Sequence, residues 1–140
     1  MNTYNFYDKN FINSKIFEEY MKINSSNGSL RLRATAASEA IPIEGVQITV
    51  YKILDNNKII FYEGQTNESG VTEKIPLPAP KLNKDIMDIP NKAVYKINAF
   101  YPKTNTKYEY EVNIYDNVCV LQNINIIPEI LKEVGDIIVN

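Results

Sequence analysis

The feature that most constrains the fold is the strict alternation of apolar and polar residues that begins at Leu30. The segments LRLRAT, from Leu30, and VQITVY, from Val46, both follow it. A period of two places every second side chain on one face of an extended strand, so that one face is buried and the other meets water. Turn-forming residues separate seven such segments, and no apolar stripe of helix length interrupts them. The sequence therefore predicts an all-β fold, an antiparallel β-sandwich of about seven strands.

Turn residues set the expected boundaries of the strands. The sequences DNNK at 55–58 and NESG at 67–70 are typical of turns. Residues 76–90 hold four of the seven prolines. Because proline donates no hydrogen bond to a strand ladder, we expect a connection between the two sheets there rather than a strand. The expected strands are 30–35, 46–51, 59–62, 71–75, 94–101, 107–115 and 118–127.

The sandwich is expected over residues 29–128, between two terminal arms. The N-terminal arm, residues 1–28, holds six of the fifteen aromatic residues. A short helix is predicted over 15–23, because Ser14 suits an N-cap and apolar residues recur there at helical spacing. The C-terminal arm, residues 129–140, begins beyond a proline. Neither arm has a core of its own, so each must pack either on this sandwich or on a neighbouring subunit.

Docking of the arms on neighbouring subunits is the favoured interpretation. Arms that reach a second copy protect sheet edges and build a larger assembly from a small domain. Packing of the arms on their own sandwich is the alternative. The side chains expected to anchor the arms are Phe6, Phe11, Phe17, Tyr20, Ile130, Val134 and Ile137.

Composition excludes several classes of function. Histidine is absent, which removes the commonest general base, the commonest metal ligand and every Ser–His or Cys–His dyad. The single cysteine, Cys119, allows neither an internal disulfide nor a Cys-x-x-Cys zinc site, and between two valines it is expected to be buried. A net charge of −2 gives no basic footprint for nucleic acid or a membrane surface. We predict that the protein is not an enzyme, with no catalytic residue, cofactor or metal ligand.

Acidic and aromatic residues leave two further functions to consider. Paired carboxylates can serve glycoside hydrolysis, although a solvated polar surface explains the acidic pairs more simply. Tyrosine stacks on sugars and dominates many protein contacts. The acidic pairs are Glu63 with Glu68, Glu109 with Glu111, and Asp85 with Asp88. The tyrosines considered for ligand binding are Tyr51, Tyr62, Tyr101 and Tyr115.

The stretches IPIEGVQITVYK, GQTNESGVTEKIPLPAP and VYKINAFYPKTNTKYEYEVNIYDNV carry a family resemblance. Together they resemble the transthyretin-like and carboxypeptidase regulatory-like sandwiches, which include the Cna-B repeats of bacterial surface proteins, in versions found in Firmicutes. The resemblance covers about residues 29–128 and implies an immunoglobulin-like or transthyretin-like sandwich. The residues that carry it suit tight turns, since glycine accepts a positive φ and Asn or Ser bonds back onto a turn. They are Pro42, Gly45, Asn67, Ser69 and Gly70.

The resemblance also raises one chemical possibility. Many Cna-B domains form an internal isopeptide bond between a lysine on the first strand and an asparagine on the last, beside a buried carboxylate. The last expected strand here offers Asn123 and Asn125, and Glu44 or Glu63 is available as the carboxylate. The first strand, LRLRATAA, has no lysine. Without the amine no such bond can form, and none is predicted.

The function expected from the sequence is that of a structural subunit in a multi-subunit bacterial or phage particle, such as a tail, baseplate or spore-surface appendage. Its partners would be other subunits of the same particle, with homo-oligomers expected. The first thirty residues contain no apolar signal segment, so synthesis in the cytoplasm and a final location in the assembled particle are expected. The alternative is an accessory module that binds carbohydrate or peptidoglycan.

Overall fold

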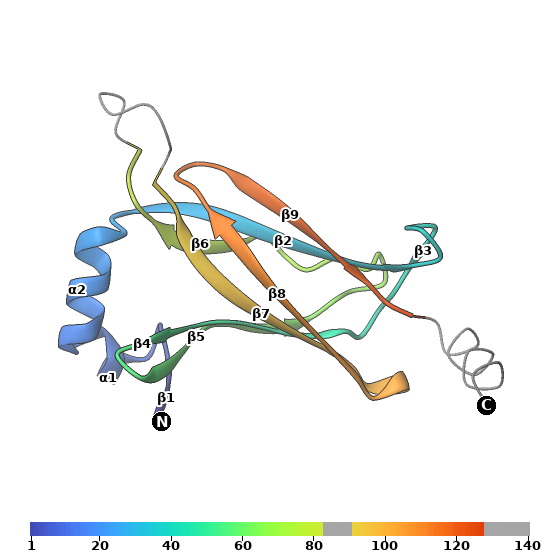
Figure 1. Ribbon diagram of the computed structural model, residues 1–140, viewed down its shortest axis with the longest axis horizontal. Coiled ribbons are helices and arrows are strands. Elements are labelled where there is room, and N and C mark those ends of the chain that lie inside the picture. The colour runs from blue at the N-terminus through green and yellow to red at the C-terminus, as the bar shows by residue number, and fades with distance from the viewer. Residues whose placement is uncertain (83–90, 128–140) are drawn as a thin grey trace.

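The computed structural model describes residues 1–82 and 91–127 as a sandwich of two β-sheets (Figure 1). One sheet has the strand order β1-β5-β4-β7-β8. In the other sheet the central strand β2 pairs with β9, β6 and β3. The strands are β1 Thr3–Asn5, β2 Ser26–Ala36, β3 Ile41–Pro42, β4 Gln47–Leu54, β5 Asn57–Gln65, β6 Ile75–Ala79, β7 Ala93–Tyr101, β8 Thr106–Ile114 and β9 Cys119–Asn125. The helices are α1 Lys9–Ile12, α2 Lys15–Ile23 and the 3-10 turn Pro102–Thr104.

The core of the sandwich is the one that the alternation predicts. Its apolar positions face inward from both sheets, and the charged positions between them face water. Five residues chosen from the period-two pattern are at most 2% exposed: Leu32, Ile48, Val50, Ile97 and Ile124. The prediction of an all-β sandwich is confirmed.

The sheets are mixed, whereas the sequence predicted an antiparallel sandwich. Strand β1 runs parallel to β5, and β9 runs parallel to β2. After β8 the chain does not return along the same sheet as a hairpin. It crosses to the other sheet through a turn in which Asn117 has a φ of 58°. β9 therefore pairs with β2 on the side opposite β6, and the two strands run in the same direction.

The hairpin between β4 and β5 forms at the predicted turn. Asp55 and Asn56 have φ values of 49° and 60°, and Leu54 pairs with Asn57 across the turn. Two consecutive residues at positive φ define the two-residue turn whose twist matches that of the flanking strands. Asp and Asn tolerate this conformation better than other residues with a side chain. The local sequence thus fixes the register of the hairpin.

The proline-rich segment corrects the predicted strand boundaries. Instead of a strand at 71–75, only Val71 bridges to Arg33, and the strand β6 runs over Ile75–Ala79. β6 includes Pro76 and Pro78, and it pairs with β2 alone among the described strands. Since the prolines alternate with Ile75 and Leu77, their missing donors fall on the side away from β2. An edge strand accepts such a sequence, whereas a central strand does not.

The N-terminal arm forms one end of the sandwich, where Figure 1 shows β1, α1 and α2 grouped beside the β4–β5 hairpin. The helix predicted over 15–23 is α2, and the Ser14 Oγ caps it by accepting a hydrogen bond from the Phe17 N–H at 3.2 Å. A second cap, Asp8, accepts from the Asn10 N–H at 2.9 Å at the start of α1. β2 begins at Ser26, so the sandwich extends into the last residues of the segment assigned to the arm.

Candidate functional site

Aromatic residues of the N-terminal arm are buried in the chain's own core. Phe6, Phe11 and Tyr20 are 4%, 2% and 7% exposed. The Phe6 ring stacks on Phe61 of β5 with the centroids 4.5 Å apart, and Phe17 packs 5.2 Å from Phe6. These side chains are not available to a neighbouring subunit. The preference for docking of this arm in trans is corrected, and the alternative, packing on its own sandwich, is what the structure shows.

The physical reason is a strand that the sequence pattern did not reveal. β1 adds to the free edge of β5, where the Lys58 N–H donates to the Asn2 carbonyl and the Phe6 N–H donates to the Ile60 carbonyl, both at 2.8 Å. Three residues are too few to display a period of two. Once β1 is paired, Phe6 points between the sheet and α2. The helix then covers the open end of the core with Phe17 and Tyr20.

A chain of hydroxyl groups joins this arm to the centre of the sandwich. The Tyr95 hydroxyl on β7 donates to the Pro78 carbonyl, so the Tyr20 hydroxyl donates to the Tyr95 oxygen, at 2.6 Å. Burial raises the pKa of Tyr20 to about 12 and raises that of Tyr95 further. Both phenols therefore stay neutral at physiological pH. The arm is fixed by polar as well as apolar contacts.

Lys52 lies against the same two rings. Its Nζ is 5.2 Å from the centroid of Tyr20 and 5.2 Å from that of Tyr95. Among the described residues no carboxylate lies within 4.0 Å of it. Burial lowers the pKa of the Lys52 amine, because desolvation disfavours its charged form. Within the described part of the chain, the Lys52 ammonium is thus stabilised by cation–π contacts with these two rings and by no ion pair.

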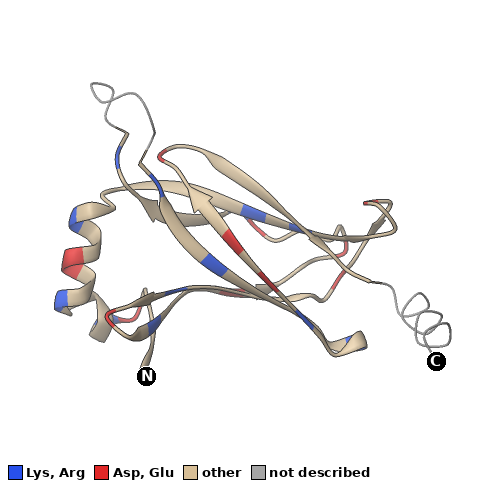
Figure 2. Ribbon diagram, viewed as in Figure 1, with Lys and Arg blue, Asp and Glu red and all other residues tan. Residues whose placement is uncertain are grey.

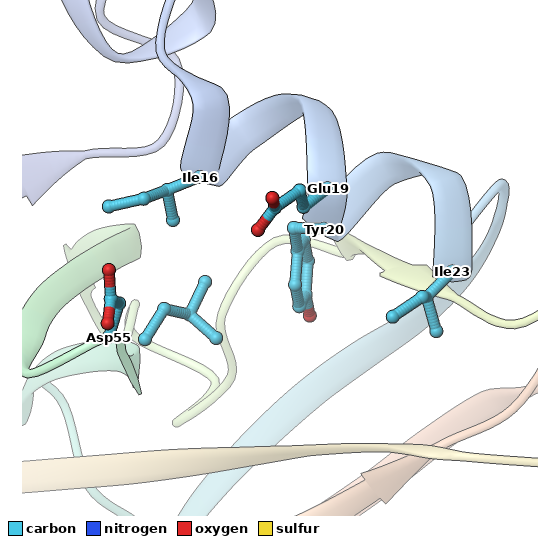
Figure 3. Close-up of a pocket in the computed structure, with 6 residues that line it drawn as sticks. Ile16, Glu19, Tyr20, Ile23 and Asp55 are labelled. Carbon is cyan, nitrogen blue, oxygen red and sulfur yellow. The ribbon is translucent and has the colours of Figure 1, made fainter.

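Beside this cluster is a cavity of about 380 Å³ between α2 and the end of β4 (Figure 3). Figure 3 shows the side chains of the helix and of the hairpin directed toward a common space. The lining residues are Ile16, Glu19, Tyr20, Ile23, Leu54 and Asp55. Three of these residues are aliphatic and one is aromatic, and the two carboxylates are its charged groups. These six residues include no nucleophile beside a base, so the cavity is suited to binding rather than to covalent chemistry.

Alkaline pH will destabilise the fold through the two buried phenols. Above pH 10 the unfolded chain releases tyrosine protons that folded Tyr20 and Tyr95 retain, so stability falls as pH rises from 10 toward 12. The lowered pKa of Lys52 acts in the opposite sense, but only below its ordinary value of 10.5. Urea unfolding between pH 10.5 and 12 should show a decline of up to about 1.4 kcal/mol per pH unit for each phenol.

Two variants separate the buried phenol from general alkaline effects. Tyr20→Phe should reduce the decline by about 1 kcal/mol per pH unit. Tyr4→Phe, which changes an exposed ring of the same arm, should leave it unchanged. An equal pH dependence in all three proteins would contradict the assignment.

The structure does not bring the four candidate tyrosines together. Tyr51 lies on the outer face of β4 under the Lys58 ammonium, 4.6 Å from its ring centroid. Tyr62 lines a different cavity, beside Glu73. Tyr101 packs against the core at the end of β7, and Tyr115 is half-buried after β8. No shared tyrosine platform exists among them.

The acidic pairs do not form a catalytic arrangement either. Glu63 and Glu68 are exposed, and Glu109 and Glu111 are exposed on the same face of β8. Asp85 and Asp88 lie outside the described residues, as do Ile130, Val134 and Ile137 of the C-terminal arm. In the part of the chain that the structure describes, no three acidic or cysteine side chains gather into a metal-binding group.

The turn residues lie where the chain reverses direction. Gly45 and Gly70 have φ values of 83° and 75°. The Asn67 Oδ1 accepts from the Ser69 N–H at 2.9 Å and from the Val71 N–H at 3.2 Å. Ser69 contributes its backbone N–H to this turn. Pro42 belongs to the two-residue strand β3, which pairs with the end of β2.

Strand β9 corrects one further expectation and bears on a second. Cys119 is exposed, because it opens the strand on the outer face instead of pointing into the core. Asn123 and Asn125 stand opposite Arg33 and Thr35 of β2, so neither faces a lysine amine there. The absence of an isopeptide bond stays a prediction.

Strand β9 is also the least protected edge of the sandwich. From Asn117 to Pro128 the sequence contains no charged residue, and in Figure 2 the ribbon of β9 carries no charge colour. Ser29 and Leu30 pair with both β6 and β9, which places those two strands on opposite sides of β2. Among the described strands β9 pairs only with β2, so its other edge presents free backbone groups. Val118, Leu121 and Ile127 are 45%, 52% and 55% exposed along it.

Comparison with known proteins gives a likeness of fold and no family. No protein-family model and no curated protein matches the sequence. A solved structure of the Bacillus anthracis TIE protein is similar over 73% of this chain and 16% of that one, at 12% identity and a TM-score of 0.50. The structure of (S)-allantoin synthase is similar over 76% of this chain and 45% of that one, at 14% identity and a TM-score of 0.47. The chain thus spans less than half of either protein, and the likeness concerns the fold alone.

The second neighbour contradicts the prediction that the protein is not an enzyme. (S)-allantoin synthase is an enzyme by its name. A fold does not by itself decide whether a protein is an enzyme. The likeness assigns no reaction, substrate or catalytic residue to this chain. Separately, none of the helices in the described ranges is long and apolar enough to cross a membrane.

Proposed function

We propose that this chain is a structural subunit of a multi-subunit bacterial or phage particle, such as a tail, a baseplate or a spore-surface appendage. The domain that it contributes is, in this proposal, a transthyretin-like sandwich of the kind found in Firmicutes. The partners are other subunits of the same particle, beginning with a second copy of this chain. The observation that carries the proposal is the uncharged free edge of β9.

The other sheet edges all have a feature that discourages pairing with another chain. β1 and β3 are three and two residues long, β6 contains two prolines, and β8 presents Lys107, Glu109 and Glu111 outward. Short strands, prolines and charges are the usual protections of sheet edges. β9 is seven residues long and has none of them. In a monomer such an edge promotes aggregation, whereas in a subunit it can pair with a strand of the neighbouring subunit.

A second copy of β9 is a suitable partner for this edge. Two β9 strands related by a two-fold axis pair antiparallel, and each free N–H and C=O finds a partner in the other copy. No register brings like charges together, since the strand carries none. The exposed Val118 and Leu121 add apolar contact along the same edge. Assembly would then run through β9 and not through the buried N-terminal arm.

Self-association should depend on the edge of β9. In a concentration series by size-exclusion chromatography with light scattering, we expect dimers or larger species of the full chain. Leu121→Lys places a charge on the edge and should shift the protein to monomers, because a charge on an edge strand opposes pairing. Ile53→Lys, at an exposed apolar residue of β4 in the other sheet, is the matched control and should associate like the unchanged protein.

Two outcomes would overturn the proposal. A full chain that stays monomeric at every concentration tested removes the basis for self-assembly. Association that is unaffected by Leu121→Lys places the interface elsewhere. A melting temperature within a few degrees of the unchanged protein verifies that the variant is folded, since both substituted side chains are exposed.

A further inference from the structure

A polar groove crosses the outer face of the five-stranded sheet, on the side opposite the core. Its volume is about 240 Å³, and the strands β4, β7 and β8 form it. The polar residues that line it, here called the outer-face groove, are Tyr51, Lys96, Asn98, Glu109 and Glu111. Figure 2 shows the positive charge of β7 next to the negative charges of β8.

The register of the strands sets the order of these groups. Lys96 pairs with Tyr51 on one side and with Glu111 on the other, and Asn98 pairs with Glu109. Directly opposed residues on one face have their Cβ atoms about 5 Å apart. The ammonium of Lys96 and the amide of Asn98 therefore each stand beside a carboxylate of β8. Tyr51 lies at the β4 side of the groove, next to Lys96.

Several of these groups have hydrogen-bonding capacity left over. Lys96 and Glu111 are cross-strand partners, yet they form no ion pair within 4.0 Å in the described part of the chain. The Asn98 Oδ1 is buried and has no hydrogen-bond partner there. A buried acceptor without a partner is unfavourable, so a ligand hydroxyl that reached this oxygen would gain a hydrogen bond.

We propose that the outer-face groove binds one unit of an uncharged, hydroxyl-rich carbohydrate. A hydroxyl group both donates and accepts, so a ring of hydroxyls matches a site in which an ammonium and an amide stand beside two carboxylates. The Tyr51 ring has the Lys58 ammonium over one face, and its other face is the apolar surface proposed for the C–H face of a sugar. The lining itself holds two carboxylates against one ammonium, and this disfavours acidic sugars by repulsion. The volume is just below the roughly 300–1,000 Å³ typical of sites for larger ligands, which suits a single sugar ring.

This inference is independent of assembly through β9, because the groove lies on the other sheet. Of the four tyrosines considered from the sequence, it retains Tyr51 alone. The cavity beneath α2 is a separate space with different lining residues.

Titration by ¹⁵N–¹H NMR tests the proposal directly. The probes are an N-acetylglucosamine trisaccharide, a glucose trisaccharide and a galacturonate trisaccharide, each added to about 10 mM to detect millimolar affinity. We expect at least one uncharged probe to shift amides of β4, β7 and β8 around the groove, and the acidic probe to cause no such shifts. Glu109→Gln and Asn98→Ala should each weaken binding roughly 5- to 10-fold.

The control is Asn113→Ala, which removes an exposed amide on β8 that does not line the groove. Its affinity should equal that of the unchanged protein. Glu109→Gln is exposed and keeps the fold, so it tests the site even if Asn98→Ala is unstable. The proposal is overturned if no uncharged probe shifts these amides, if the acidic probe binds equally well, or if Glu109→Gln binds as tightly as the control.

Discussion

Substitution of Phe6 by alanine will lower the free energy of unfolding by about 3–5 kcal/mol, the cost of removing a fully packed phenylalanine. Phe6 is 4% exposed and its ring contacts Phe11, Phe17, Tyr20 and Phe61, so the cavity left behind would lie at the centre of the junction between arm and sandwich. Urea unfolding monitored by circular dichroism gives the difference.

The matched control lies on the same arm. Ile23→Ala removes an apolar side chain of α2 that is 71% exposed, and it should change stability by no more than about 0.5 kcal/mol. If Phe6→Ala is as stable as this control, the arm does not belong to the core, and docking on a neighbouring subunit becomes the better interpretation. Deletion of residues 1–24 should likewise destabilise the sandwich and not leave it intact.

The second large effect is expected at Gly70. Its φ of 75° is unfavourable for any residue with a side chain, and an added Cβ would lie 2.6 Å from the Ala34 carbonyl oxygen and 3.0 Å from the Ile43 nitrogen. Both are backbone atoms, and the Ala34 oxygen already accepts from the Ile43 N–H. Gly70→Ala should therefore cost about 2–4 kcal/mol, through the left-handed conformation and the steric overlap together.

Gly45 separates these two causes. Its φ of 83° is similar, but nothing lies within 4 Å of the position that a Cβ would take. Gly45→Ala should cost only the conformational part, about 1–2 kcal/mol. Equal melting temperatures for the two variants would show that the turn can move away from β2, contrary to the tight contact described here.

Those parts of the fold that are local in sequence could be predicted. The helix of the arm begins where expected because Ser14 both favours and occupies the N-cap. The β4–β5 turn follows from Asp55 and Asn56, and the inward residues of the long strands follow from alternation. Each of these features depends on a few consecutive residues and on little else.

The errors concern partners that lie far apart in sequence. Nothing in Thr3–Asn5 indicates that this segment pairs with β5, so the arm was expected to be free of its own sandwich. Pro76 and Pro78 are incompatible with a central strand but acceptable at an edge, and the sequence does not say which strand is at an edge. Cys119 has apolar neighbours, yet it starts an edge strand and is exposed.

The candidate sites depend on the same long-range pairing. The outer-face groove needs the registers of three strands, which place Asn98 beside Glu109 and Lys96 beside Tyr51. From the sequence, Tyr51 was one of four equivalent tyrosines. Alternation indicates that Glu109 and Glu111 share a face, but it does not indicate what stands opposite them.

The parallel pairing of β2 with β9 has a consequence for synthesis on the ribosome. β2 emerges early, whereas the strand that covers one of its edges is the last that the structure describes. Leu30 and Leu32, which are fully buried in the finished sandwich, lack this cover until translation has passed β9. Contacts between segments so distant in sequence slow folding. The nascent chain therefore carries one unpaired edge of β2 through most of its elongation, and such edges favour chaperone binding and aggregation.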